Sequence, residues 1–292
     1  MDIWLQQLLI GISLGAIYAL IALGYTMVYG IIKLINFAHG DVFMIGAFVG
    51  YYALTAFHLG FIPSLLVAML VSALLGVTIE RVAYRRLRNA PRLNALTTAI
   101  GVSLFIEYTT IYARGAQPAA YPALFPNRRL ELFGASIKWD AVVILLTAVF
   151  LMVVLQLIVQ RTRTGKAMRA VSFDLEAARL MGISVDRTIA ITFALGSALG
   201  GAAGVIYGLY YTKIDPFMGV LTGLKAFVAA VLGGIGSIPG AMVGGLVIGL
   251  VETLVSAVGW SLFRDAAAFL ILILILLFRP EGLFGRHAPE KV

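Results

Sequence analysis

The chain has 292 residues, of which 61% are hydrophobic and only 12% are charged, with a formal net charge of +8 and no cysteine. An average soluble domain carries roughly 25% charged residues, so this composition excludes a soluble protein and indicates one transmembrane domain over residues 1–292. The lack of cysteine excludes disulfides and thiolate metal sites, and basic loops beside anionic lipid explain the positive charge without a nucleic-acid partner.

Uncharged segments, taken in chain order, predict about nine membrane-spanning helices. Residues 3–32 contain no charge and exceed the ~20 residues that a helix needs to cross the hydrocarbon core. No basic region precedes them, so we interpret them as a retained span and not a signal peptide. The other spans are expected in residues 42–79 (two spans, broken at 58–63), 93–113, 141–160, 188–212, 226–251 (two spans, broken at 233–240) and 260–278. The fold class is therefore an all-α polytopic helix bundle, with eight or ten spans as alternatives.

Basic residues are concentrated in two loops, and this predicts the orientation. They are Arg81, Arg85, Arg86, Arg88 and Arg92 in the first loop, and Arg161, Arg163, Lys166, Arg169, Arg179 and Arg187 in the second. The positive-inside rule assigns both loops to the cytoplasm, which puts the N-terminus outside and the C-terminus inside. The loop 114–138 does not follow the positive-inside rule, because it is also basic but is expected outside.

Polar and glycine-rich turns interrupt two apolar segments. Residues 36–41 read Asn-Phe-Ala-His-Gly-Asp, residues 233–240 read Gly-Gly-Ile-Gly-Ser-Ile-Pro-Gly, and a segment of small apolar residues follows each turn. We interpret them as a possible internal repeat, since interrupted segments in matching halves of a transporter mark its substrate path. The residues expected to line this path are Asn36, His39, Asp41, Gly233, Gly236 and Ser237. The alternative is that both segments are simple turns at the cytoplasmic face.

Glycine recurs at every fourth position in the span after Arg187, at Gly196, Gly200, Gly204 and Gly208. Such a strip lets a neighbouring helix approach closely, so it predicts helix packing. The alternative is that helices slide along this strip during transport. Glu107, Lys225 and Glu252 are ionisable residues in or near apolar segments, and each is expected either at a span end or facing the protein interior.

No catalytic or cofactor motif occurs in the chain. The sequence contains neither HExxH nor GxSxG nor a Walker A loop. We therefore expect neither an enzyme nor a bound metal or cofactor, and any ATP that drives transport must be hydrolysed by another chain.

The predicted cytoplasmic loop 161–187 carries the most informative motif. Residues 166–181 contain neither proline nor glycine and predict one helix, which Gly182 would end in the ordinary way. The run Glu176-Ala177-Ala178, followed later by Gly182, resembles the EAA loop of ABC-importer permeases, whose short helix docks into the ATPase. The proline that usually follows is absent from residues 191–194, which favours a divergent permease class.

Several segments together resemble the branched-chain amino-acid ABC permeases of the LivH type. They are residues 11–20, 35–41, 161–182, 233–245 and 278–285. The resemblance implies a multi-pass permease of the bacterial inner membrane, coupled to ATPases through Glu176, Ala177, Ala178 and Gly182. It also implies four partners: a second homologous permease chain, two ABC ATPase subunits that hydrolyse ATP, and a periplasmic substrate-binding protein. Permeases for urea or short-chain amides look similar, and a secondary transporter independent of ATP is a further alternative.

Overall fold

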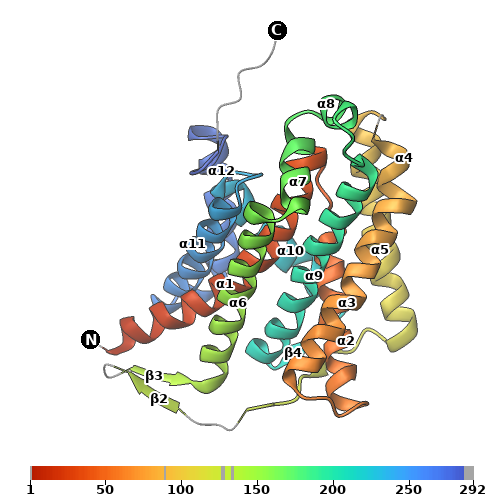
Figure 1. Ribbon diagram of the computed structural model, residues 1–292. Coiled ribbons are helices and arrows are strands. Elements are labelled where there is room, and N and C mark those ends of the chain that lie inside the picture. The colour runs from red at the N-terminus through yellow and green to blue at the C-terminus, as the bar shows by residue number, and fades with distance from the viewer. Residues whose placement is uncertain (1, 89, 126–128, 133–134, 286–292) are drawn as a thin grey trace.

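A computed structural model describes residues 2–88, 90–125, 129–132 and 135–285, which are nearly all helical (Figure 1). The helices are α1 Asp2–Ile32, α2 His39–Thr55, α3 Phe61–Ile79, α4 Arg85–Leu87, α5 Arg92–Arg114, α6 Trp139–Arg161, α7 Arg163–Phe173, α8 Leu175–Leu180, α9 Val185–Tyr211, α10 Met218–Gly233, α11 Ile238–Ala257 and α12 Arg264–Phe278. A π-helical turn, Glu80–Tyr84, joins α3 to α4, and a 3-10 turn, Ser261–Phe263, precedes α12. The expectation of an all-α chain misses four short strands, β1 Ala119–Ala120, β2 Arg129–Leu132, β3 Ala135–Lys138 and β4 Lys213–Ile214, which pair antiparallel as β1 with β4 and β2 with β3.

Seven of the described helices are long and apolar enough to cross a membrane. They are Trp4–Ile32, Phe61–Leu87, Leu93–Arg114, Trp139–Arg161, Val185–Tyr211, Ile238–Ala257 and Ser261–Phe278. The other two expected spans fall on α2 and α10, which have 17 and 16 residues and are shorter than the ~20 needed to cross alone. The breaks expected near 58–63 and 233–240 are confirmed, because α3 begins at Phe61 and α11 begins at Ile238.

Two triplets of helices, α1–α2–α3 and α9–α10–α11, form the centre of the bundle. The two triplets run in opposite directions. α1 rises from the lower end of Figure 1, whereas α9 descends from the upper end toward β4. The main contacts of the triplets correspond: α1 packs along α11 as α9 packs along α3, and the short helices α2 and α10 contact each other. This is the inverted repeat common among transporters, with interrupted helices at its centre.

The sequence retains traces of this repeat. The run Gly-Ala-Ile-Tyr-Ala-Leu at 15–20 corresponds to Gly-Val-Ile-Tyr-Gly-Leu at 204–209, and Ala-Phe-Val occurs at both 47–49 and 226–228. The repeat expected from sequence was therefore paired wrongly. Residues 36–41 lead into α2 as residues 215–220 lead into α10. Residues 233–240, in contrast, connect α10 to α11 as residues 56–60 connect α2 to α3. Composition alone could not reveal this, because it carries no information on chain direction.

Backbone-to-backbone contact holds the helices of the core together. A Cβ on Gly15 would lie 2.7 Å from the Cα of Leu246, and one on Gly245 would lie 2.5 Å from the Cα of Ala19, so α1 and α11 touch directly. At the corresponding contact between α9 and α3, a Cβ on Gly201 would lie 2.7 Å from the carbonyl oxygen of Ala68. In a membrane the hydrophobic effect does not drive helices together, because lipid tails are as apolar as the side chains. Close backbone contact therefore stabilises the bundle through van der Waals packing.

Candidate functional site

The first turns of α2 and α10 meet inside the bundle. A Cβ on Gly219 would lie 2.7 Å from the carbonyl oxygen of Gly40, and one on Gly223 would lie 2.9 Å from the Cα of Gly40. Only glycine permits this approach. The positive ends of two helix dipoles therefore converge at one place, an arrangement that favours a negative charge there.

The three polar residues predicted from the first turn surround the start of α2. Asn36, His39 and Asp41 are each at most 2% exposed. The hydroxyl of Ser103 on α5 donates to the Oδ2 atom of Asp41, and the hydroxyl of Tyr84 lies 3.2 Å from the Oδ1 atom of Asn36. The structure thus buries all three residues at the start of α2 but on different sides of it, with the His39 ring beside Gly24 and Gly200 and the Asp41 carboxylate beside Ser103.

The start of α2 contains polar atoms without a protein partner. Within the part of the chain that the structure describes, Asn36 Nδ2, His39 Nε2 and Asp41 Oδ1 accept or donate no hydrogen bond. The His39 ring lies edge-on to Tyr25, with ring centroids 4.9 Å apart. Buried polar groups without partners are costly, so these atoms mark a place where water or a ligand would be stabilised.

The second predicted turn lies at the opposite end of α10. From Gly219 to Gly233 the helix rises by about 21 Å at 1.5 Å per residue. Gly236 has φ +98°, and the Ser237 side chain caps α11 by accepting a hydrogen bond of 3.2 Å from the backbone N–H of Gly240. Here the chain meets the segment after α12, since the N–H of Phe284 donates to the carbonyl of Gly233 at 3.0 Å. The two predicted turns are therefore not brought together.

A buried ion cluster joins three helices elsewhere in the bundle. Lys225 Nζ on α10 lies 2.9 Å from Glu252 Oε1 on α11 and 2.5 Å from Asp265 Oδ1 on α12. The hydroxyl of Tyr18 on α1 donates to Glu252 Oε2 at 3.0 Å. Sequence reasoning noted Lys225 and Glu252 separately and missed Asp265. Because these three residues lie on different helices, no spacing along the chain predicts that they form ion pairs.

The predicted coupling segment, residues 166–182, contains parts of two helices, α7 and α8, rather than one helix. The Asp174 side chain accepts hydrogen bonds of 2.9 Å from the backbone N–H groups of Glu176 and Ala177 and so starts a new helix, α8. The expected continuous helix over 166–181 is therefore wrong, because an aspartate cap competes with helix continuation. Gly182, at φ +79°, ends α8, as predicted. The N–H of Ile183 donates to the carbonyl of Ala178 at 3.0 Å, which completes a Schellman motif.

The predicted coupling segment exposes apolar side chains. It lies at the upper end of Figure 1, where α8 is found. Phe173, Leu180 and Met181 are 91%, 89% and 81% exposed. Glu176 and Ala177 are also exposed, whereas Ala178 is buried. An exposed apolar group of this kind, rimmed by charge, is typical of a surface that another protein covers.

The predicted glycine strip of α9 contacts a different neighbour at each position. A Cβ on Gly196 would lie 3.3 Å from the Cα of Gly24, and one on Gly200 would lie 3.2 Å from the His39 ring. At Gly204 it would lie 2.5 Å from the backbone nitrogen of Ala47 on α2. At Gly208 it would lie 2.5 Å from the ring of Tyr121. The strip thus faces α1, α2 and the loop before β2.

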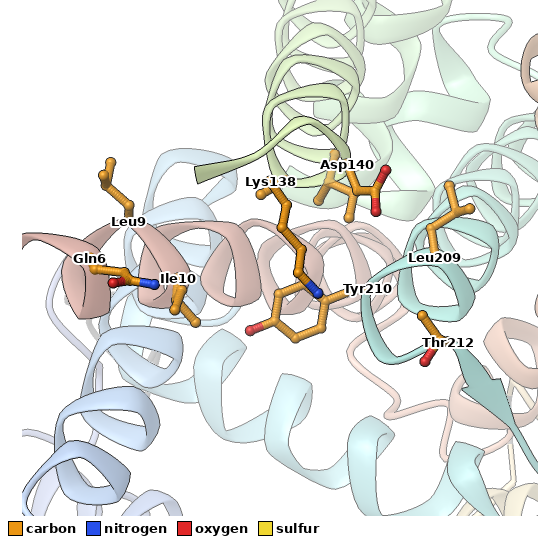
Figure 2. A pocket seen from close by; sticks show the side chains of 10 residues that line it. Gln6, Leu9, Ile10, Lys138, Asp140, Leu209, Tyr210 and Thr212 are labelled. Atoms are coloured by element: carbon orange, nitrogen blue, oxygen red, sulfur yellow. The ribbon is translucent and has the colours of Figure 1, made fainter. Parts of the chain in front are cut away.

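Two cavities lie toward opposite ends of the bundle. One, of about 310 Å³, is lined by Gln6, Leu9, Ile10, Lys138, Asp140, Ala141, Ile144, Leu209, Tyr210 and Thr212. Figure 2 shows the Lys138 side chain extending into it toward Tyr210. The other, of about 330 Å³, lies beside the first predicted turn and is lined by Tyr29, Lys33, Leu34, Ile35, Leu93, Ala95 and Leu96. Among the described residues, no group of three or more His, Asp or Glu side chains could hold a metal ion.

Comparison with known proteins identifies the family. The profile described as branched-chain amino acid transport system / permease component matches residues 7–278. The high-affinity branched-chain amino acid transport system permease protein LivH of Salmonella typhimurium is 46% identical over 301 residues, which cover 99% of this chain and 98% of the relative. BraD of Pseudomonas aeruginosa, named as a permease of the same kind of system, is 44% identical with the same coverage. No solved structure matches the chain. Because the profile and the relatives match nearly end to end, the chain belongs to the family of permease components of branched-chain amino acid transport systems.

Proposed function

We propose that this chain is the transmembrane permease subunit of an ABC importer for branched-chain or related hydrophobic amino acids. The observation that carries the proposal is the apolar coupling segment at one end of a helix bundle whose family consists of such permease components. Two ABC ATPase subunits bind this segment and hydrolyse ATP, so the chain itself carries no cofactor and catalyses no reaction. A second, homologous permease chain completes the path, and a periplasmic binding protein delivers the substrate.

The membrane is the bacterial inner membrane, and the topology is that expected from the basic loops. The coupling segment and α4 face the cytoplasm, and the N-terminus and the β2–β3 hairpin face the periplasm. α2 and α10 together cover the depth of the bilayer, so nine helical segments lie within it. The opposite directions of the two triplets support this assignment, because each interrupted helix then begins near mid-depth.

The substrate path passes the start of α2, with Asn36, His39 and Asp41 beside it. The support is their unpartnered buried atoms and the meeting of the first turns of α2 and α10 beside them. Gly233, Gly236 and Ser237 belong to its cytoplasmic end, where Gly236 lines a small cavity together with Gly30. The glycine strip of α9 holds α2 in register beside the path.

The exposed face of α5 borders the path and the second permease chain. It carries the polar residues Asn94, Thr97, Tyr108 and Thr109 among exposed apolar residues such as Leu104 and Phe105. The exposed faces of α6 and α12 are aliphatic or aromatic at membrane depth, with residues such as Leu146, Val153, Ile273 and Leu277. Polar side chains facing lipid are costly, so protein or water covers this face of α5.

Reconstitution tests the proposed function. The chain is purified with the second permease, ATPases and binding protein encoded by neighbouring reading frames and placed in proteoliposomes. We expect ATP-dependent uptake of radiolabelled leucine that unlabelled isoleucine or valine suppresses and that urea or acetamide does not. Leucine uptake without ATP would indicate a secondary transporter, and uptake of urea in place of leucine would overturn the substrate assignment.

Cysteine labelling tests the topology, since the chain has no native cysteine. Cysteine replaces three exposed residues: Arg86 on α4, Ala116 after α5 and Ile273 on α12. A membrane-impermeant maleimide should label Ala116→Cys from the periplasm and Arg86→Cys only after the membrane is opened. Ile273→Cys, which faces lipid, should resist labelling in both conditions. Labelling of Arg86→Cys in intact cells would reverse the orientation.

A further inference from the structure

A chain of charged side chains ties the end of α3 to the first turn of α9. Arg88 Nη1 lies 2.5 Å from Asp186 Oδ1, and Arg88 Nη2 pairs with Glu80 Oε1. Arg85 pairs with the second oxygen of Asp186. The Glu80 side chain is only 2% exposed and that of Arg88 is 15% exposed. Asp186 lies four residues after Gly182, so this cluster joins the first turn of α9, directly after the coupling segment, to the turn that follows α3.

The same turn reaches the segment that begins α2. Tyr84 follows Glu80 by one π-helical turn, and its hydroxyl lies 3.2 Å from both the carbonyl oxygen of Ile35 and the Oδ1 atom of Asn36. The Tyr84 side chain is buried, and its ring packs on Phe193 of α9 with centroids 5.4 Å apart. The carbonyl of Asn36 in turn accepts a hydrogen bond of 3.0 Å from the N–H of His39, the first residue of α2.

These contacts form one continuous series from the coupling segment to the interior. It runs from Asp186 through Arg88 to Glu80, then through Tyr84 to Asn36 and α2. The middle of the series is a π-helical turn, a rare element that frequently occurs at functional sites. Coupling between distant sites requires an element with two discrete arrangements, and this turn is the natural candidate.

We propose that Asp186, Arg88, Glu80 and Tyr84 are positioning residues that transmit movement of α8 to the start of α2. The inference rests on the proposed function, because it assumes that ATPases move α8. When the first turn of α9 moves, Arg88 moves with it. Glu80 must follow, because a buried carboxylate that loses its partner is strongly destabilised. The π-helical turn then carries the Tyr84 hydroxyl, and the polar residues at the start of α2 are repositioned.

Removal of a single hydroxyl tests this relay. Tyr84→Phe keeps the ring on Phe193 and deletes only the hydrogen bond to the segment before α2. In proteoliposomes we expect ATP hydrolysis to stay near the wild-type rate while leucine uptake falls by about three- to tenfold, the scale of one hydrogen bond. The matched control is Tyr52→Phe, at an exposed position near the end of α2, for which the amount of uptake per ATP hydrolysed should stay unchanged.

The ionic step has its own pair of variants. Arg88→Gln should lower uptake per ATP hydrolysed, whereas Arg86→Gln, at an exposed position of α4 two residues earlier, should leave uptake per ATP hydrolysed unchanged. Arg88→Gln leaves the buried Glu80 carboxylate without its cation, so the double variant Glu80→Gln/Arg88→Gln is measured as well. If the relay exists, the double variant restores folding but does not restore uptake per ATP hydrolysed. A combined Tyr84→Phe and Glu80→Gln/Arg88→Gln variant should be no worse than the more affected parent, since both break one series.

The outcomes separate the relay from the proposed function. Wild-type uptake per ATP in Tyr84→Phe, or equal losses of uptake and ATP hydrolysis, would overturn the relay while leaving the importer assignment intact. Absence of ATP-dependent uptake in the wild-type assembly would instead overturn the proposed function.

Discussion

Replacing Glu176 by lysine is expected to abolish leucine uptake in the reconstituted importer. Glu176 is exposed in the first turn of α8, next to the apolar residues of the coupling segment. The substitution reverses a charge on the surface that we assign to the ATPase and also places a cation at the positive end of the helix. Uptake and stimulated ATP hydrolysis are measured in proteoliposomes, and membrane insertion is checked by the amount of purified chain.

A second variant and a control test the same surface. Gly182→Pro should abolish uptake as well, because proline cannot adopt the φ of +79° found there and lacks the N–H that donates to the carbonyl of Arg179. The control Lys213→Glu reverses an exposed charge at the opposite end of the bundle and should retain uptake. If Glu176→Lys keeps both uptake and stimulated ATP hydrolysis, α8 is not the ATPase contact.

Replacing Lys225 by methionine is expected to give the largest loss of stability. Methionine has a similar length, but it leaves the buried Glu252 carboxylate without its cation. Breaking a buried ion pair from one side costs about 3 to 5 kcal/mol. The measurement is the free energy of unfolding in detergent, with unfolding monitored by intrinsic tryptophan fluorescence.

The double variant decides whether charge is the cause. Lys225→Met/Glu252→Gln removes both charges and should recover most of the lost free energy of unfolding, because Tyr18 can still donate to the amide oxygen. Leu277→Ala, at an exposed position of α12, serves as the control and should change stability little. Equal destabilisation in the single and double variants would mean that packing around Lys225, and not its charge, matters.

Hydropathy and local motifs were enough to predict the membrane class, most of the long helices and the family. The uncharged run 141–160 lies within α6, Trp139–Arg161, because lipid tolerates neither charge nor unpaired backbone along a span. The glycine at 182 predicted the end of the coupling helix, since positive φ is a local property of the chain. Motifs distributed over the whole length predicted the family that the comparisons show.

The three-dimensional packing was needed to show which interrupted segments meet and which charges pair. Gly40 lies against Gly219 and not against the turn at 233–240, and Lys225 pairs with Glu252 and Asp265 on two other helices. Even the break at Asp174 required knowing that its carboxylate caps α8. Hydrophobic runs and glycine spacing report the demands of lipid and of local backbone geometry. They carry no information on helix direction or on partners far apart along the chain, which are determined by packing of the bundle as a whole.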